Sequence, residues 1–512
     1  MPNSDNTLVN AMLEPEFYNH PVQQVQLIET HISWVFLTGD YAYKIKKPVD
    51  FGFLDFTRLE RRKFYCEEEL RLNSRLAADI YLNVTPITKA DGTFQLDGDG
   101  EPVEYAVKMK QFDPHSLLKQ LLEDDQIHLQ HIEQLADKLA DFHQQIECAG
   151  AHTPFGQSGE VIKPVAQNFS LLRDIVSDAQ DLNKLLIVEQ AAMKLHQQLK
   201  TVFDDRKQQG FIRECHGDMH LGNIALIDDR ILIFDGIEFN DSFKWIDTMS
   251  ELAFLVMDLQ DQQRDDFASR VVNRYLSRTG DYQGLQVLRF YQMYRAMVRA
   301  KVNGLQMQQQ TDDAARHEYQ HDMRNYLDLA IRYTETPMPF IAITYGLSGS
   351  GKSWLAAQLA EYNGAIIIRS DVERKRLFSE QQNLYSKDTT RQTYDHLIRL
   401  ASDIYAAGYP VLIDATFLER ENRDRFKNLA QQLDARFSII HCHADIETLQ
   451  QRIRQRQVAR KDESDADIEV LKMQLARQPG LAEDESNYTL DVDTGGKPDI
   501  AELAERLAGA GN

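Results

Sequence analysis

Short stretches of alternating apolar and polar residues dominate the first part of the chain. They occupy residues 25–29, 34–38 and 41–47, and a Gly39-Asp40 pair separates the last two. A period of two is typical of β-strands, and glycine next to aspartate favours a tight turn. Alternation over 41–47 places Lys44 on the face opposite the large apolar residues. The pattern therefore predicts strands joined by a hairpin.

Longer stretches carry apolar residues three and four positions apart, the spacing of one helix face. They run through residues 58–78, from 127 to 146, through 165–205 and through 247–332. After residue 340, helical stretches alternate with short apolar strands, which predicts a parallel sheet with ligands at the carboxyl ends of its strands.

These patterns divide the chain into two folding regions, as its length of 512 residues also suggests. Two prolines within residues 334–339 end a helix and begin a strand. We expect an N-terminal arm over 1–24, a first domain over 25–335, a linker over 336–339 and a second domain over 340–512. In the first domain we expect a small lobe over about 25–112 and a large lobe over about 113–335.

The most specific motif begins the second domain. An apolar run over 340–345 leads into Gly346-Leu-Ser-Gly-Ser-Gly-Lys352-Ser353, which matches the P-loop pattern G-x-x-x-x-G-K-S, and a helical stretch follows. The glycines let successive N–H groups point at a phosphate, and the helix N-terminus adds a partial positive charge. Lys352 would reach the β- and γ-phosphates, and the Ser353 hydroxyl would complete a Mg²⁺ shell. The predicted nucleotide-binding residues are Gly346, Ser348, Gly349, Ser350, Gly351, Lys352 and Ser353.

Two acidic residues follow later strands of this domain. Asp414 ends the apolar run 409–414 and fits a magnesium ligand of the Walker-B type. Asp371 lies beyond the strand that we place next to the P-loop, where its carboxylate could take the proton from an acceptor hydroxyl. Arg374, one helical turn further on, would brace the phosphate.

A second chemical centre lies in the first domain, at His216-Gly-Asp218-Met-His-Leu-Gly-Asn223, followed by an apolar strand over 231–234 that ends in Asp235. The spacing from Asp218 to Asn223 equals that of the protein-kinase catalytic loop. Phosphoryl transfer needs a carboxylate that accepts the hydroxyl proton and hard oxygen ligands for Mg²⁺. Asp218 suits the first role, and Asn223 and Asp235 suit the second. A polar turn between two strands is the alternative interpretation.

Lys44 is the upstream partner of this centre. On a strand after a hairpin, it is placed as protein kinases place the lysine that binds the α- and β-phosphates. One of Glu67, Glu68 and Glu69 on the helical stretch 58–78 is expected to pair with Lys44, and we select Glu69. The alternative for Lys44 is a solvated lysine on an edge strand. The alternative for the three glutamates is the solvent-exposed face of a helix.

These motifs resemble known families. His216-Gly-Asp218 with Asn223 and Asp235 resembles the aminoglycoside phosphotransferase group, relatives of choline and homoserine kinases within the protein-kinase-like fold. Residues 43–56 (YKIKKPVDFGFLDF) resemble a bacterial group identified as bifunctional aminoglycoside phosphotransferase/ATP-binding proteins, which fuse such a domain to a P-loop domain. The resemblance covers nearly the whole chain. It implies a two-lobed fold for about 20–335, with ATP at the hinge from Met109 to Phe112.

The second domain resembles polynucleotide kinases, zeta toxins and gluconate-type kinases at Asp371-x-x-Arg374 and at the strand ending in Asp414. Arg452, Arg456 and Arg460 recur every fourth residue and line one helix face. This run resembles the lid of small P-loop kinases, which implies that Arg456 and Arg460 clamp the transferring phosphate; a solvated basic face is the alternative. The fold class expected is an α+β protein-kinase-like two-lobed domain followed by an α/β P-loop domain with a parallel sheet.

The chain departs from the protein-kinase pattern at two places. His216-Gly replaces the kinase His-Arg, and residues 30–33 (THIS) contain no glycine where protein kinases have a Gly-rich loop. The motifs handle nucleotide and metal rather than the acceptor, so phosphorylation of an antibiotic does not follow from them.

Composition restricts the partners. The net charge of −22 argues against general binding to nucleic acid or to an anionic membrane, which both require basic surfaces. His441-Cys-His443 is better interpreted as a buried strand than as a metal pair, and His143 as a packed side chain. Four cysteines without paired spacing indicate reduced thiols and a cytoplasmic protein. They are Cys66, Cys148, Cys215 and Cys442.

The sequence thus predicts a kinase with two sites, each transferring the γ-phosphate of ATP, or alternatively of GTP, to a hydroxyl of a small-molecule acceptor with the aid of Mg²⁺. Two other functions stay open. One is a nucleotide sensor in which one domain gates the other, and the second is a kinase for nucleic-acid ends. No membrane partner is expected, and the patterns make no prediction of oligomeric state.

Overall fold

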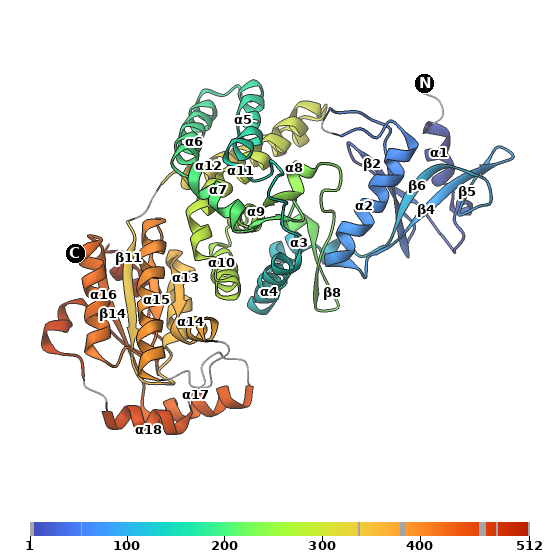
Figure 1. Ribbon diagram of the computed structural model, residues 1–512. Coiled ribbons are helices and arrows are strands. Elements are labelled where there is room, and N and C mark those ends of the chain that lie inside the picture. The colour runs from blue at the N-terminus through green and yellow to red at the C-terminus, as the bar shows by residue number, and fades with distance from the viewer. Residues whose placement is uncertain are drawn as a thin grey trace. The chain divides into compact units, whose positions relative to one another are not determined.

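The computed structural model describes residues 5–52, 54–335, 338–378, 386–459, 467–477 and 480–509. The chain, traced in Figure 1, forms two compact units. The first comprises Met1–Gln134, Asp141–Pro164 and Phe203–Leu255; the second comprises Leu135–Ala140, Val165–Val202 and Val256–Asn512. The second unit thus joins the last helices before residue 335 to the P-loop domain. Of the expected linker over 336–339, residues 336 and 337 lie outside the described part.

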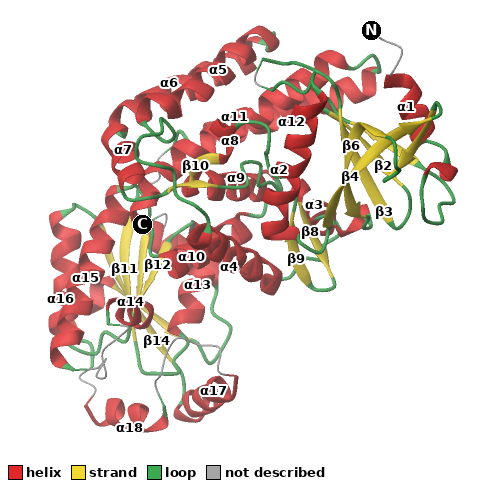
Figure 2. Ribbon diagram, turned by 45° about the vertical axis from the view of Figure 1, so that its right-hand side comes forward, coloured by secondary structure: helices red, strands yellow, loops and turns green. Residues whose placement is uncertain are grey.

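The first unit begins with a six-stranded sheet (Figure 2). Its order is β1-β2-β3-β6-β4-β5, and every neighbouring pair is antiparallel. Helix α2 (Leu59–Ala77) packs against β4 and β6. The predicted strands and hairpin over 25–47 are confirmed. The strands are β1 (Gln26–Glu29), β2 (Ser33–Leu37), β3 (Tyr41–Lys46), β4 (Tyr81–Ala90), β5 (Thr93–Leu96) and β6 (Glu101–Lys110).

The residues expected to form an N-terminal arm instead pack on this sheet. They contain α1 (Asp5–Met12) and the short helix η1 (Pro15–Phe17). Met12 and Tyr18 are buried in one apolar cluster with Tyr43 of β3, and the Tyr18 hydroxyl donates to the Met12 carbonyl at 2.6 Å. The apolar face of β3 needs this cover, because burial of apolar surface is the main source of its stability.

A small hairpin carries the polar residues of the predicted catalytic loop. It consists of β8 (Ile224–Ile227) and β9 (Arg230–Ile233), which pair antiparallel with Ile224 opposite Ile233. This register places Asn223, the residue before β8, beside Phe234, whose N–H donates to the Asn223 carbonyl at 2.9 Å. Asp235, the residue after Phe234, therefore lies close to Asn223 in space. The neighbouring elements are η2 (Pro114–Ser116), α3 (Leu118–Glu123), β7 (Ile212–Glu214), η3 (Leu221–Asn223), α8 (Asp241–Lys244) and β10 (Trp245–Asp247).

The remaining helices follow the predicted stripes. Four of them run through both units: α4 (Leu129–Gln145), α5 (Ser158–Ile175), α7 (Lys200–Gln208) and α9 (Thr248–Asp261). The second unit contains α6 (Ala179–Gln198), α10 (Asp265–Thr279), η4 (Tyr282–Gly284), α11 (Leu285–Gln309) and α12 (Asp313–Arg332). Helices α11 and α12 pack against each other, and α10 packs against the first helix of the P-loop domain.

The P-loop domain is built on a five-stranded sheet in which all neighbouring strands are parallel. Its order is β12-β13-β11-β14-β15, so β13 lies between β12 and the P-loop strand β11. The expectation that Asp371 follows the strand next to the P-loop is therefore wrong by one position. The strands are β11 (Phe340–Tyr345), β12 (Ile366–Arg369), β13 (Val411–Asp414), β14 (Arg436–His443) and β15 (Thr489–Asp493).

Helices cover both faces of this sheet (Figure 1). They are α13 (Lys352–Asn363), α14 (Ser370–Leu377), α15 (Lys387–Ala406), α16 (Arg420–Gln432), α17 (Ile446–Ala459), α18 (Ile468–Arg477) and α19 (Ile500–Ala508), with η5 (Glu483–Tyr488) before β15. Helices α13 and α19 bury their apolar residues in one cluster with Ala342, Leu412 and Cys442. Cys442 faces this core, as the interpretation of residues 441–443 as a strand predicted.

The architecture is thus a kinase-like domain followed by an α/β domain with a parallel sheet. None of the helices in the described ranges combines the length and apolar character that a membrane crossing requires.

Two candidate phosphotransfer sites

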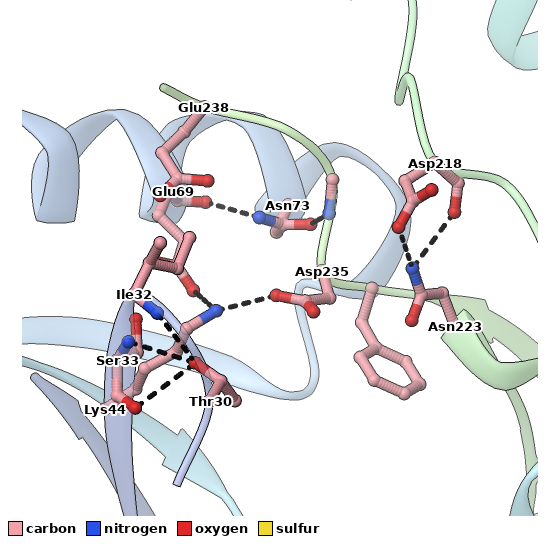
Figure 3. Close-up of polar contacts among 12 residues, drawn as sticks. Thr30, Ile32, Ser33, Lys44, Glu69, Asn73, Asp218, Asn223, Asp235 and Glu238 are labelled. Carbon is pink, nitrogen blue, oxygen red and sulfur yellow. Dashed lines mark hydrogen bonds and ion pairs between the residues drawn. The ribbon is translucent and has the colours of Figure 1, made fainter. Parts of the chain in front are cut away.

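Lys44 is the centre of an ion-pair network in the first unit (Figure 3). From β3, its Nζ lies 2.8 Å from Oε1 of Glu69 on α2 and 2.6 Å from Oδ1 of Asp235 beyond β9. Burial opposes the charge of Lys44, but the carboxylates of Asp235 and Glu69 outweigh it and raise the pKa of Lys44 well above its usual value. Strand, helix and hairpin residues that are distant in sequence therefore meet here.

The three candidate glutamates of α2 differ sharply in their surroundings. Glu69 is fully buried, whereas the side chain of Glu67 is 55% exposed and Glu68 pairs with Arg71. Successive residues of a helix point about 100° apart, so only one of three neighbours can face a given partner. Burial opposes the charge of Glu69, but Lys44 and a second lysine outweigh it and lower the pKa of Glu69 to about 2.

The second lysine is Lys46, for which the sequence patterns gave no role. Its side chain is 1% exposed, its Nζ lies 2.8 Å from Oε2 of Glu69, and it also forms an ion pair with Glu238. The only sequence signal was the alternation that places Lys44 and Lys46 on the same face of β3. Glu238 carried no signal, because its partner lies on a remote strand.

Asp218 and Asn223 lie together at the start of the β8–β9 hairpin (Figure 3). The Asn223 amide donates to the Asp218 carbonyl at 3.0 Å and to its carboxylate Oδ2 at 3.2 Å. Asn223 is buried, and the Asp218 side chain is 36% exposed. The amide oxygen of Asn223 is left available as a hard ligand, while the Asp218 carboxylate reaches solvent.

A buried set of side chains fixes the backbone of this loop. Glu251 of α9 accepts the Gly217 N–H at 2.7 Å and a hydrogen bond from His143 at 2.9 Å. His216 accepts the Asp218 N–H at Nδ1 (3.3 Å), and its Nε2 contacts the Phe234 carbonyl at 2.9 Å. Burial lowers the pKa of His216 and so favours the neutral imidazole, whose Nδ1 can accept this hydrogen bond. The packed role predicted for His143 thus has a polar partner in Glu251.

The segment that carries Asp235 is held by residues of the small lobe. The Asp235 N–H donates to the Tyr81 hydroxyl at 3.2 Å, and the Gly236 N–H donates to Asn73 Oδ1 at 2.7 Å. Asp235 itself has a φ of 61°, a left-handed conformation that is uncommon outside glycine. The surrounding hydrogen bonds hold this conformation, which turns the carboxylate toward Lys44.

The turn between β1 and β2 is closed by a side chain rather than by glycines (Figure 3). Thr30 Oγ1 accepts the N–H groups of Ile32 and Ser33 at 3.4 and 3.0 Å and donates to the Ser33 carbonyl. Ser33 pairs with Lys46 of β3. This compact turn occupies the position at which the sequence departs from the protein-kinase pattern.

The predicted hinge residues end the small lobe. Met109 lies on β6, and Phe112 follows two residues after the strand. Both pack against an apolar cluster that contains Leu232 of β9, and the ring of Phe112 meets that of Phe234 edge-on at 5.2 Å. This apolar cluster joins α2, β4 and β6 of the small lobe to the β8–β9 hairpin.

The P-loop of the second unit has the backbone that its glycines predict. Gly346, Gly349 and Gly351 have φ values of 149°, 83° and 77°, and a Cβ on Gly346 would lie 2.3 Å from the Cys442 carbonyl. Lys352 Nζ donates to the Leu347 carbonyl at 2.7 Å. Burial lowers the pKa of Lys352, and the nearby Asp414 carboxylate partly offsets this decrease.

A cavity of about 830 Å³ opens above this loop. Asp371, Arg374 and Asp414 line it with the P-loop residues, and Arg369 Nε lies 3.4 Å from the Asp414 carboxylate. Such a volume is typical of a ligand pocket. Five of the predicted P-loop residues line it, namely Ser348, Gly349, Gly351, Lys352 and Ser353, whereas Gly346 and Ser350 shape the loop from behind.

The arginine helix α17 reaches the same cavity. Arg456 lines it, as predicted, and Arg460 lies outside the described residues. Arg452 was not selected from the sequence, yet its guanidinium donates to the Thr494 carbonyl at 2.7 Å and contacts the Gly349 carbonyl at 3.4 Å. Arg452 thus links the P-loop to the end of β15, a contact that helix periodicity alone does not reveal.

Helix α14, which carries Asp371 and Arg374, is anchored from outside the P-loop domain but within the second unit. Glu373 is buried and accepts hydrogen bonds from Tyr282 of η4 and His396, each at 3.2 Å. Arg376 pairs with Glu373 and donates to the Ser277 carbonyl in the last turn of α10 at 2.5 Å. A cation at a helix C-terminus is favourable.

Comparisons with known proteins agree with this arrangement. Models of two families, described as Phosphotransferase enzyme family and AAA domain, match residues 56–291 and 341–481. Uncharacterized proteins of Mycobacterium tuberculosis and Mycobacterium bovis are each 30% identical over 447 residues, which cover 85% of this chain and 87% of theirs. The chain belongs to the Phosphotransferase enzyme family. As a member of the Phosphotransferase enzyme family it is a kinase-type enzyme, and its P-loop implies that it uses a nucleotide.

Solved structures similar to this phosphotransferase include a choline/ethanolamine kinase family protein from Mesorhizobium loti, with 11% identity and a TM-score of 0.38 over 65% of this chain and 98% of that protein. A gluconokinase from Sinorhizobium meliloti has 22% identity and a TM-score of 0.24 over 34% of this chain and 91% of its own.

Proposed function

We propose that the chain is an ATP- and Mg²⁺-dependent kinase with two nucleotide sites, each of which transfers the γ-phosphate to a hydroxyl of a small-molecule acceptor. The observation that supports this most directly is the convergence of Lys44, Asp235, Asn223 and Asp218 from separate segments of the first unit. A phosphate-binding cation, two oxygen ligands and a partly exposed carboxylate are the groups that phosphoryl transfer needs.

At the N-terminal site, Lys44 binds the α- and β-phosphates, and Glu69 keeps the Lys44 ammonium in position. The apolar surface at Met109 and Phe112 receives the adenine. Asp218 accepts the proton of the acceptor hydroxyl as the hydroxyl oxygen attacks the γ-phosphorus, and the bond from that phosphorus to the β,γ-bridging oxygen breaks to release ADP. Mg²⁺, held by Asn223 and Asp235, would neutralise charge on the phosphates.

At the C-terminal site, the N–H groups of the P-loop and the ammonium of Lys352 bind the phosphates. To bind them, Lys352 would give up its hydrogen bond to the Leu347 carbonyl. Asp371 accepts the proton of the acceptor hydroxyl, and Arg374 and Arg456 stabilise the phosphate that is being transferred. Ser353 and Asp414 are the residues that would hold Mg²⁺.

The test is label transfer by the full-length chain. Wild type is incubated with Mg²⁺ and γ-labelled ATP or GTP, together with aminoglycosides, sugars, nucleosides, hydroxylated amino acids and a nucleic acid with a free 5′-hydroxyl. Asp218→Asn and Lys352→Ala assign any labelled product to one site. Calorimetric titration of Mg·ATP runs in parallel. Absence of any Mg·ATP binding would overturn the proposal, whatever the acceptor panel gives.

A matched pair of controls separates site effects from charge effects. Asp228→Asn removes one carboxylate at the exposed β8–β9 turn, and Lys497→Ala removes one exposed ammonium of the P-loop domain. Both variants should transfer label as wild type does. Equal losses in controls and site variants would contradict the assignment of the sites.

A further inference from the structure

Two lysines of β3 share one glutamate. Glu69 places Oε1 at 2.8 Å from Lys44 Nζ and Oε2 at 2.8 Å from Lys46 Nζ, and Lys46 continues the chain of charges to Glu238. The side chains of Lys46, Glu69 and Glu238 are 1%, 0% and 5% exposed. Lysines and glutamates are almost never buried this deeply unless they are paired.

The charges of this network balance only if Asp235 is left out. Lys44, Glu69, Lys46 and Glu238 carry two positive and two negative charges, whereas Asp235 adds a third negative charge and is half-exposed. When Asp235 turns to a metal and Lys44 to phosphates, Lys46 still forms ion pairs with both Glu69 and Glu238. A buried pair that loses one partner is strongly destabilised, so this second cation matters for the liganded state.

The Lys46–Glu238 pair also fixes the segment that bears Asp235. Glu238 is three residues beyond Asp235, and between them Gly236 is held by Asn73 of α2 and Ile237 by the His216 carbonyl at 2.9 Å. Figure 3 shows Glu69 and Glu238 on one side of this segment and Asp235 facing Lys44. The segment is therefore attached to the small lobe at two points, at Asp235 through Lys44 and at Glu238 through Lys46.

We infer that Lys46 and Glu238 are positioning residues of the N-terminal site: their ion pair fastens the segment that carries Asp235 to β3 and keeps the Asp235 carboxylate beside Lys44, where it can serve a nucleotide-bound metal. The inference rests on the proposed function, because it assigns Asp235 to the metal. Neither residue touches the nucleotide; both act through Asp235 and Glu69. Loss of a partner that orients a metal ligand typically lowers metal affinity or activity by about 10- to 100-fold.

The test measures ATP affinity by calorimetry, with and without Mg²⁺, in full-length chains that all carry Lys352→Ala to silence the second site. Glu238→Gln and Lys46→Met should each weaken Mg·ATP binding by about tenfold while metal-free ATP binding stays within about twofold. A merely structural role would change both affinities together. Lys47→Met is the matched control, since it removes the neighbouring lysine and its pair with the exposed Glu29.

The double variant Lys46→Met/Glu238→Gln guards against misfolding, because it removes both charges and leaves Lys44 and Glu69 balanced. It should unfold at a higher temperature than either single variant and yet retain the loss of Mg²⁺-dependent affinity. Recovery of that affinity in the double variant would mean that the pair only balances charge, and would overturn the inference. So would unchanged Mg·ATP affinity in a folded single variant. Absence of Mg·ATP binding in the Lys352→Ala parent would instead refute the proposed N-terminal nucleotide site.

Discussion

Lys44 Nζ lies 2.6 Å from Oδ1 of Asp235, although 191 residues separate them in the sequence. The cation that we propose for the phosphates and the carboxylate that we propose for the metal thus form an ion pair with each other. The side chain of Asp235 is 50% exposed, whereas that of Lys44 is 12% exposed. In the proposed function, Mg·ATP would separate the pair, because Lys44 would turn to the phosphates and Asp235 to the metal.

Replacement of Asp218 by Asn should separate binding from chemistry. The amide keeps the shape and can still contact Asn223, but it cannot accept the acceptor proton. We expect nearly unchanged ATP affinity and a loss of about 10²- to 10⁴-fold in transfer by the N-terminal site. Initial rates of transfer to an acceptor that the wild type phosphorylates check this prediction, with Asp228→Asn as the control. Equal turnover in wild type and Asp218→Asn would remove Asp218 from the mechanism.

Asp235→Asn should behave differently, because Asp235 meets the metal rather than the acceptor. We expect weaker binding of Mg·ATP and a smaller dependence of ATP affinity on Mg²⁺ concentration. Titration of ATP at several Mg²⁺ concentrations measures both quantities. If the Mg²⁺ dependence in Asp235→Asn matched that of wild type, Asp235 would not be a metal ligand.

Lys352→Ala should abolish one of two nucleotide-binding events. Lys352 lines the cavity of the P-loop domain, where we propose that it supplies positive charge to the phosphates, whereas Lys44 belongs to the other unit. Calorimetry of wild type should show two Mg·ATP sites, and the variant should retain one. Lys497→Ala controls for the loss of an ammonium. Two unchanged sites in Lys352→Ala would exclude the P-loop as a nucleotide site.

Helix α14 should depend on the end of α10. Gly280 has a φ of 74°, and a Cβ there would lie 2.9 Å from Arg376 Nε, whereas Gly364 has a φ of 68° and meets nothing within 4 Å. Both Gly→Ala changes should cost about 1–2 kcal/mol of backbone strain. Only Gly280→Ala should displace Arg376 and loosen α14. Hydrogen exchange of the backbone amides of residues 370–377 should then become faster, and the KM of the C-terminal site for its acceptor should rise. Identical exchange in the two variants would mean that Arg376 does not anchor the helix.

Folding stability should fall as the pH is lowered through the range in which histidine titrates. His216 is buried, and burial lowers its pKa below the ordinary value of 6.5. The unfolded chain then binds the proton first, so acidification below 6.5 favours unfolding until the folded pKa is reached. In denaturant unfolding between about pH 7.5 and pH 5.5, His216→Gln should show a smaller loss of stability than wild type.

The exposed His152 provides the comparison for this effect. His152→Gln should keep the pH dependence of wild type, because this variant leaves the buried His216 and its partners unchanged. A His216→Gln protein whose stability falls as steeply as that of wild type would assign the effect to other groups.

The sequence determined the motifs whose geometry is local. The P-loop over 346–353, the spacing of Asp218 and Asn223 and the strand that ends before Asp235 each lie within one or two consecutive elements, so periodicity and spacing suffice to predict them. The family resemblance rests on the same residues, and the matching family models support it. Lys44 also followed from its position on a strand after a hairpin.

Only the tertiary structure decided which remote residues meet. The selection of Glu69 depended on how α2 is rotated about its axis, and the burial of Lys46 on a glutamate 192 residues away. The position of β13 between β12 and the P-loop strand followed from the connections, and the packing of residues 5–18 on β3 from an apolar face that needed cover. Sequence patterns carry the period of an element but not its rotation or its neighbours, because those are set by burial and charge pairing between segments that are far apart in the chain.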